Sequence, residues 1–328
     1  MKKIIMLLLL LVVPLLFQTL DVNASGSFVN KNGITISNVD YNKLKSVGYT
    51  DDEILTLTVE KYNKVSNMNI ISQKSNTKYL YEIENQRSKE ISTLVVDAPI
   101  QLYEESTITN GYVKVDTYGT FYKNLGTLGE FFVKVNVSYF GNVSNRLEDI
   151  IGISNSDNVQ IKSEYINGSQ RPKFEFNLTY MEDYYCRDFT TYPEKVSEYT
   201  SNHSLKYDGK DLTQYKYYID KGIIVKYDLP SDYHNTSSSA QIKQEKNIEY
   251  YNFKATIAAD FVVKQTGLNA CTFAGLNIIQ NEGGEIDFSK ISISTQPPYF
   301  SYDAAWWRPD PHFEDPVGSC IFFENLYN

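Results

Sequence analysis

The sequence predicts a mainly β protein: an antiparallel β-sandwich preceded by a small N-terminal helical hairpin. Apolar and polar residues alternate through residues 132–139 and again through residues 173–180, which is the two-residue period of a half-buried strand. Aromatic residues make up 14% of the chain, with 27 tyrosines, and tyrosine favours pleated, half-buried surfaces. Capping signals near the N-terminus predict the short helices.

The first 24 residues have the features of a secretory signal peptide. Lys2 and Lys3 form a basic start, and residues 4–17 form an apolar stretch too short to span a membrane comfortably. Val22 and Ala24 place modest or small residues before a cleavage point at Ser25. Residues 322–328 form no long apolar tail. We therefore expect a secreted, extracellular protein without a stable membrane anchor after cleavage.

The excess of acidic over basic residues argues against some classes of binding partner. The chain has 40 acidic and 31 basic residues, a formal net charge of −9. Nucleic acid binds basic surfaces that release its counterions, so we expect no nucleic-acid partner. The acidic balance also disfavours attachment to anionic lipid. The partners that remain are an extracellular glycan or a protein.

Residues 25–66 predict a short leader followed by the helical hairpin. Three residues are typical helix N-caps: Ser37, Thr50 and Thr58. An acidic residue follows the first two caps after three positions, as in a capping box. Gly48 stands where a left-handed C-terminal cap belongs. Helices this short are marginal alone, so their apolar side must be buried. That side comprises Val39, Leu44, Val47, Ile54 and Leu57.

We predict a linker over residues 67–90 and the β-sandwich over residues 91–328. Residues 147–153 form a dense apolar run, as in a strand buried on both faces, between the alternating segments 132–139 and 159–161. The predicted core comprises Val133, Val135, Val137, Ile150, Ile151 and Ile153. Residues 181–211 predict a long polar connection outside the sheet, and residues 231–240 predict a Ser-rich loop.

One segment of this domain carries a family resemblance. Residues 149–153 (DIIGI), followed by Asn158, Val159 and Ile161, resemble the DIIGI…NV.I β core of uncharacterised secreted proteins of Gram-positive bacteria. The N-terminal hairpin is similar to a module found at the front of such proteins. The resemblance implies secretion and β architecture, and it implies no activity.

The cysteines and short motifs favour a non-catalytic protein. Cys186, Cys271 and Cys320 are far apart and form no CxxC. In an oxidising compartment Cys271 and Cys320 are the candidate disulfide pair, and three buried thiols are the alternative. The chain contains no HExxH, no EF-hand loop and no GxSxG elbow. We therefore expect no catalytic residues, no metal site and no cofactor.

Residues 297–307 (PPYFSYDAAWW) hold both tryptophans of the chain beside two prolines. Aromatic rings on a stiff loop can stack on sugars or anchor in a partner's pocket. The candidate binding residues are therefore Tyr299, Tyr302, Trp306 and Trp307. Alternatively, the two tryptophans close one end of the sandwich.

These features predict a secreted, non-catalytic β protein that binds an extracellular or cell-surface component. Two alternatives stay open: a secreted hydrolase whose site has no sequence signature, and a membrane-active, toxin-like protein. The acidic charge counts against the membrane-active reading. A pocket with convergent polar groups would favour the enzyme, and an aromatic platform would favour the binding protein.

Overall fold

The structure, a computed structural model, describes residues 26–85, 91–99, 106–141, 148–155, 159–166, 168–188, 195–207, 215–218, 222–227, 229–236, 244–264, 270–279 and 317–323. The predicted signal peptide and the aromatic segment 297–307 lie outside these residues. The chain divides into two compact units. Among the described residues, the first unit comprises 26–45 and 49–67, and the second comprises 46–48 and those from 68 onward.

The first unit contains the predicted helices. The antiparallel pair β1 (Ser27–Val29) and β2 (Thr35–Ser37) precedes α1 (Asn38–Ser46), α2 (Asp51–Leu55) and α3 (Val59–Ser66). The capping box at α2 is complete, because Glu53 N donates to Thr50 Oγ1 (3.3 Å) and Thr50 N donates to Glu53 Oε2 (2.8 Å). Ser37 and Thr58 also accept hydrogen bonds from the backbone of the helices they precede. The predicted caps are therefore confirmed.

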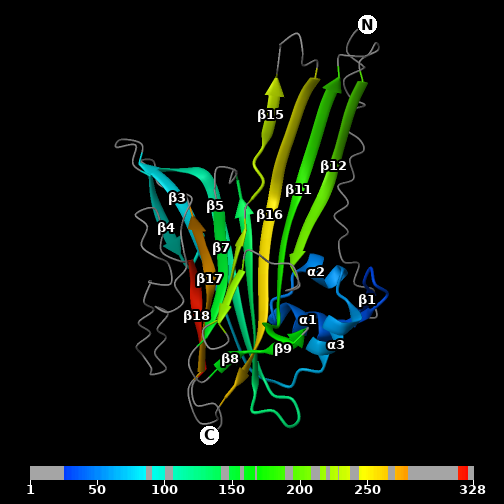
Figure 1. Cartoon of the computed structure of the whole chain (residues 1–328), viewed down its shortest axis with the longest axis vertical. Coiled ribbons are helices and arrows are strands. Elements are labelled where there is room, and N and C mark those ends of the chain that lie inside the picture. The colour runs from blue at the N-terminus through cyan, green and yellow to red at the C-terminus, as the bar shows by residue number, and fades with distance from the viewer. Residues whose placement is uncertain are drawn as a thin grey trace. The chain divides into compact units, whose positions relative to one another are not determined.

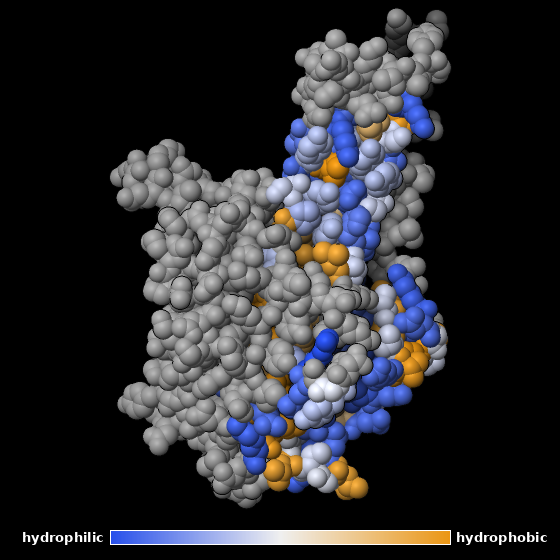
Figure 2. All heavy atoms as spheres, viewed as in Figure 1, coloured by the Kyte–Doolittle hydropathy of each residue, from blue (hydrophilic) through white to orange (hydrophobic). Residues whose placement is uncertain are grey.

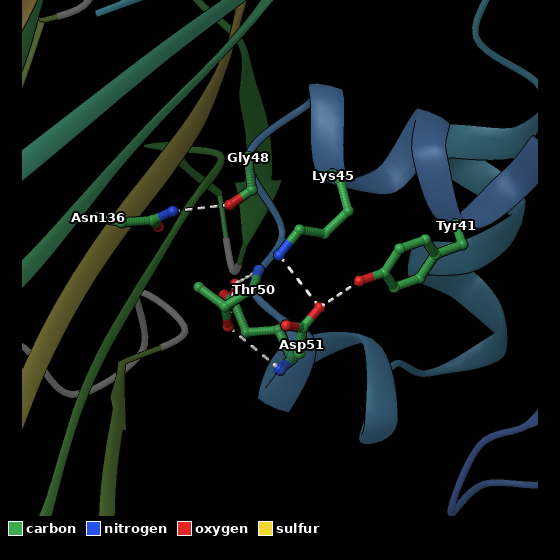
Figure 3. A network of polar contacts seen from close by, with 7 residues as sticks. Tyr41, Lys45, Gly48, Thr50, Asp51 and Asn136 are labelled. Carbon is green, nitrogen blue, oxygen red and sulfur yellow. Dashed lines mark hydrogen bonds and ion pairs between the residues drawn. The ribbon is translucent and has the colours of Figure 1, made fainter. Parts of the chain in front are cut away.

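Polar side chains tie the loops of this unit to its helices. Buried Asn30 donates from Nδ2 to the carbonyls of Ile54 (3.2 Å) and Leu57 (2.9 Å), and its Oδ1 accepts from two backbone N–H groups. Asp51 accepts from Tyr41 OH (2.7 Å) and from Lys45 Nζ (3.1 Å), as Figure 3 shows. The hydrogen bond to Asp51 raises the pKa of Tyr41 to about 12.

Most of the predicted apolar side of these helices is buried. Leu44, Ile54 and Leu57 are almost fully buried, as predicted. Val39 is 76% exposed, so its assignment to this side is wrong. It precedes Leu44 by five residues, which places it roughly 140° around the helix from Leu44.

The second unit consists of antiparallel sheets (Figure 1), which confirms the mainly β, sandwich-like class. The nine-stranded sheet has the order β12-β11-β16-β6-β5-β3-β4, with β8 and β15 also paired to β16. The five-stranded sheet has the order β13-β14-β7-β17-β18, and β9 pairs with β10 separately.

The strands of the first sheet are β3 (Ile70–Asn85), β4 (Ile91–Val96), β5 (Ser106–Tyr122), β6 (Glu130–Phe140), β8 (Val159–Ile161), β11 (Phe174–Asp188), β12 (Lys195–Tyr207), β15 (Tyr233–Thr236) and β16 (Gln244–Val263). The others are β7 (Glu148–Asn155), β9 (Ser163–Ile166), β10 (Ser169–Pro172), β13 (Tyr215–Tyr218), β14 (Gly222–Tyr227), β17 (Ala270–Ile279) and β18 (Val317–Phe323).

The core lies between the two sheets. One buried cluster joins residues of β5, β6, β11 and β16 to residues of β7 and β14. Five predicted core residues belong to it and are fully buried: Val133, Val135, Val137, Ile151 and Ile153. Ile150 lies in β7, but its side chain is outside the described set. Because β6 and β8 belong to one sheet and β7 to the other, the chain crosses between the sheets twice over this segment.

Three stretches differ from their predicted irregular structure. Residues 70–85, within the predicted linker, form β3. Residues 174–188 form β11 and residues 195–207 form β12, and the two strands pair antiparallel. The predicted polar connection over residues 181–211 is therefore wrong for residues 181–188 and 195–207. The predicted Ser-rich loop contains β15. Residues 181–187 and 195–203 were not predicted as strands because they are partly or fully exposed on both faces. Their sequence therefore lacks the alternation of apolar and polar residues that marks a half-buried strand.

Residues 46–48 group with the second unit through Gly48. The Gly48 carbonyl accepts a hydrogen bond from Asn136 Nδ2 at 2.7 Å, shown in Figure 3. Gly48 has a φ of +101°, as expected for a left-handed cap. A Cβ at position 48 would lie 2.6 Å from the ring of Tyr118. Position 48 therefore requires glycine for both its backbone and its packing.

Gly48→Ala should lower the free energy of unfolding by about 2–5 kcal/mol, combining left-handed strain with overpacking against Tyr118. Gly126→Ala is the matched control, since Gly126 has a φ of +82° and no atom within 4 Å of its added Cβ. It should cost about 1–2 kcal/mol from strain alone. Urea denaturation of both variants measures the difference. Equal losses would show that contact with Tyr118 is unimportant.

Candidate functional site: a tyrosine face on the sheet extension

One end of the nine-stranded sheet continues past the strands of the second sheet (Figure 1). Here β16 no longer pairs with β6, whose last partner on β16 is Lys254. It still pairs with β11, and β15 pairs with its residues 245–248. We call this part, residues 180–188, 195–203, 233–236 and 244–252, the sheet extension. Figure 2 shows mainly hydrophilic and intermediate residues on its visible side, with small hydrophobic patches.

One face of the extension continues the core face. Along β11, the buried residues Phe174, Phe176 and Leu178 are followed at the same two-residue period by Tyr180, Glu182, Tyr184 and Cys186. The register of β12, β15 and β16 adds aromatic residues to this face. We call this set the tyrosine face: Tyr180, Tyr184, Tyr199, His203, Tyr233 and Tyr250.

A β-bulge at Asn252 decides which β16 tyrosine joins this face. Between the pairs Thr179–Lys254 and Met181–Tyr251, β11 advances two residues and β16 advances three. Asn252 has a φ of +56°, a conformation that asparagine tolerates better than most residues. Consequently both Phe253 and Tyr250 pack against Tyr180, with ring centroids 5.8 and 5.7 Å away.

The rings of the tyrosine face pack in pairs across the strands. Tyr184 stacks on Tyr199 with centroids 4.6 Å apart, and Tyr180 stacks on His203 at 5.0 Å. Lys246 Nζ lies 5.3 Å from the Tyr184 ring centroid and 5.7 Å from that of Tyr233. Tyr199 is 49% exposed and Tyr233 is 47% exposed. The face therefore presents rings held in place by neighbours and open to solvent in part.

The carboxylate of Glu182 lies among these rings. Its Oε2 is 2.8 Å from His203 Nε2, and its Oε1 accepts from Tyr199 OH at 3.4 Å. Burial, and secondly the charge of Glu182, raise the pKa of three surrounding tyrosines: Tyr180, Tyr199 and Tyr250. Tyr184 has a raised pKa chiefly because it hydrogen-bonds to Cys186. The face thus combines aromatic surface with the acidic hydrogen-bonding group of Glu182.

The polar groups near His203 do not form a nucleophilic triad. Ser201 Oγ and Glu182 Oε2 lie 2.9 and 2.8 Å from His203, but both at the same ring nitrogen, Nε2. A serine triad requires the acid on one imidazole nitrogen and the serine on the other. Cys186 forms no dyad with His203 either, because His203 pairs with Tyr180, six residues or roughly 20 Å along β11.

A second group of carboxylates is buried rather than accessible. Tyr122 OH donates to Glu130 Oε2 at 2.6 Å and lies 3.3 Å from Asp260, while Lys162 Nζ donates to Glu130 at 2.9 Å. All but Lys162 are buried, and burial with the neighbouring carboxylates raises the pKa of Tyr122 well above its usual range. The described residues include no group of three or more metal-ligating side chains suited to an ion.

A second aromatic row crosses β3, β5 and β6. Tyr81 stacks on Tyr112 at 5.1 Å, and Tyr112 stacks on Phe140 at 4.5 Å. Tyr81 is buried, and only Phe140 at the end of the row is exposed. These rings therefore serve mainly as cross-strand packing.

The predicted site residues fall in three places. Tyr299, Tyr302, Trp306 and Trp307 lie outside the described residues. Cys271 and Cys320 lie on β17 and β18, where Cys271 pairs with Phe322 and Cys320 with Phe273. Such diagonal neighbours lie about 7–8 Å apart at Cα, beyond the usual disulfide range, so this register works against the candidate disulfide, which stays a prediction. Cys186 is a free thiol on the tyrosine face.

Sequence reasoning did not identify the tyrosine face. Tyr184, Tyr199 and His203 fall in the stretch assigned to a polar connection. The signal that could have found them is the continued period from Phe174 and Phe176 to Tyr180 and Tyr184.

Comparisons with known proteins give no family. No protein-family model matches the chain, and no curated protein matches it. Among solved structures, Clostridium perfringens delta-toxin matches with 10% identity over 51% of this chain and 73% of its own, at a TM-score of 0.26. A structure described as a pore forming protein matches with 7% identity over 65% and 83%, at a TM-score of 0.27. Clostridium perfringens NetB toxin in the membrane-inserted form matches with 8% identity over 62% and 84%, at a TM-score of 0.22. Scores this low do not establish a shared fold.

Glu182→Gln should lower the pKa of Tyr180, Tyr199 and Tyr250, because a neutral amide no longer opposes formation of the phenolates. Each tyrosine should then ionise at a lower pH in an NMR titration of ring-labelled protein.

Asp183→Asn is the matched control on the opposite face, where burial, and secondly Asp183, raise the pKa of Tyr251. It should lower the pKa of Tyr251 alone. If both substitutions shift the same tyrosines, Glu182 is not the centre of the tyrosine face.

Proposed function

We propose that this chain is a secreted, non-catalytic β protein that binds an extracellular glycan through the tyrosine face. The observation that carries the proposal is the geometry of this face, with partly exposed rings stacked in pairs around one carboxylate. Preorganised rings lose little conformational entropy when a ligand packs on them.

A glycan fits this chemistry better than other extracellular ligands. Sugar rings have an apolar face of C–H groups and a rim of hydroxyls. Aromatic rings pack against the apolar face, and the Glu182 carboxylate and tyrosine hydroxyls can form hydrogen bonds with the sugar hydroxyls. A protein hot spot would instead bury its anchors at the centre of a larger apolar patch. The tyrosine face mixes rings with the charged groups of Glu182 and Lys246.

The two alternative functions receive less support from the same residues. A hydrolase needs converging catalytic groups, and the Ser201–His203–Glu182 arrangement lacks triad geometry. A lipid-contacting strand needs one apolar face, but β11 in the extension carries Glu182 on one face and Asp183 and Arg187 on the other. None of the helices in the described part of the chain is long and apolar enough to cross a membrane.

Tyr199→Ala and Tyr233→Ala should each weaken glycan binding about tenfold or more, since each removes an exposed ring from the face. Screening the mature protein on a glycan array identifies a ligand, and calorimetry then compares the variants. Tyr251→Ala is the matched control, a partly exposed tyrosine on the opposite face of β16. It should bind as the parent does.

Equal loss in all three variants, or absence of any glycan ligand, would contradict the proposed site. Release of dye from lipid vesicles at the same protein concentration would favour the membrane-active alternative.

The secreted location has its own test. Cells that express the full chain should release a product whose N-terminal sequence begins at Ser25, since the predicted cleavage follows Ala24. Intact Met1 on protein recovered from inside the cell, with none in the medium, would show that the location is wrong.

A further inference from the structure

The nine-stranded sheet ends in one unusually long edge. Within the described part of the chain, β12 pairs only with β11, and its other side has no strand neighbour. β12 has 13 residues, whereas β4 at the opposite edge has 6, and the edge strands β13 and β18 of the other sheet have 4 and 7. Soluble proteins usually keep edge strands short or interrupt them, because unpaired backbone groups recruit another strand.

The composition of β12 leaves this edge suited to pairing. The strand contains no proline and no glycine, and six of its 13 residues are serine, threonine or tyrosine. Three large side chains on it are exposed: Val196, Tyr199 and Leu205. Tyr199 is 49% exposed and Leu205 is 45% exposed, and both lie on the face of the sheet that carries the tyrosine face.

We propose that two copies of this chain associate through their β12 edges, which pair antiparallel across a two-fold axis at Asn202. Closed two-fold symmetry is the commonest arrangement of homodimers, and it makes two identical edge strands antiparallel. The association does not depend on glycan binding, although Tyr199 belongs to both the tyrosine face and the β12 edge.

Charge selects the register. In an antiparallel pair of identical strands, opposite residues must both be odd or both be even, since their backbone groups point the same way. Glu198 is the only acidic residue of β12, and the strand has two lysines, Lys195 and Lys206. Glu198 can stand opposite Lys206 but never opposite Lys195, and the axis then falls at Asn202.

The same register also pairs exposed apolar groups. With the axis at Asn202, Tyr199 of each copy stands opposite Leu205 of the other, and residues 197–207 form the shared ladder. Each favourable pair occurs twice because of the symmetry. The two copies of the tyrosine face then share one continuous sheet surface, which would present a glycan with two sets of rings.

A charge swap tests the register. The mature protein should sediment as a concentration-dependent dimer in analytical ultracentrifugation. Glu198→Lys and Lys206→Glu should each raise the dimer dissociation constant about tenfold, because two attractive pairs become repulsive. The double variant, Glu198→Lys with Lys206→Glu, should restore the parent value. Failure of the double variant to recover, or a monomer at every concentration, overturns the proposal.

Cysteine cross-linking tests the axis. Asn202→Cys places a thiol opposite its own copy, so mild oxidation should yield a disulfide-linked dimer beyond any formed by the parent. Ser204→Cys is the matched control, because in this register position 204 faces Thr200 and lies away from its own copy. Equal cross-linking of the two variants overturns the register.

Discussion

The strict two-residue period of the β-strand ties the tyrosine face to the core. Phe174, Phe176 and Leu178 are buried between the sheets, and their period fixes Tyr180, Glu182 and Tyr184 on the same side of β11. A slip by one residue would turn every one of these side chains to the other face. The burial of three apolar residues therefore sets the orientation of the tyrosine face, which has no core of its own.

The bulge at Asn252 breaks this period on β16, and the break is needed for Tyr250 to join the tyrosine face. The buried residues Phe253, Ala255 and Ile257 of β16 are odd-numbered, yet Tyr250 faces the same side. Without the extra residue, Tyr251 would take this place, and Tyr250 would pair with Asp183 on the opposite face. Asn252 accepts the left-handed backbone at low cost, so one local residue adjusts the whole distal half of β16.

The parts of the fold that sequence predicts are those in which one physical signal dominates. The helix caps at Ser37, Thr50 and Thr58 are local hydrogen bonds. The alternation in β6 places Val133, Val135 and Val137 on the core face, although Lys134 and Asn136 on the other face are buried as well. The assignment of β7 to a different sheet from β6 and β8 is a long-range property, since its neighbours are β14 and β17. The distal β11–β12 hairpin escaped because its residues are exposed on both faces, and the candidate site lies there. The aromatic segment 297–307, which sequence favoured as the site, lies outside the described residues.

A sheet that leaves its core must be stabilised by other means. In the extension, the backbone ladders of β11, β12 and β16 are supported by cross-strand pairs such as Tyr184 with Tyr199 and Thr200 with Asp183. The same rings therefore stabilise the strands and form the proposed surface for a ligand. Because such pairs contribute roughly 0.2–1 kcal/mol each, the extension is held less firmly than the sandwich. A ligand that packs on the rings, or a second copy that extends the ladder at β12, would stabilise the part of the molecule that has the least burial of its own.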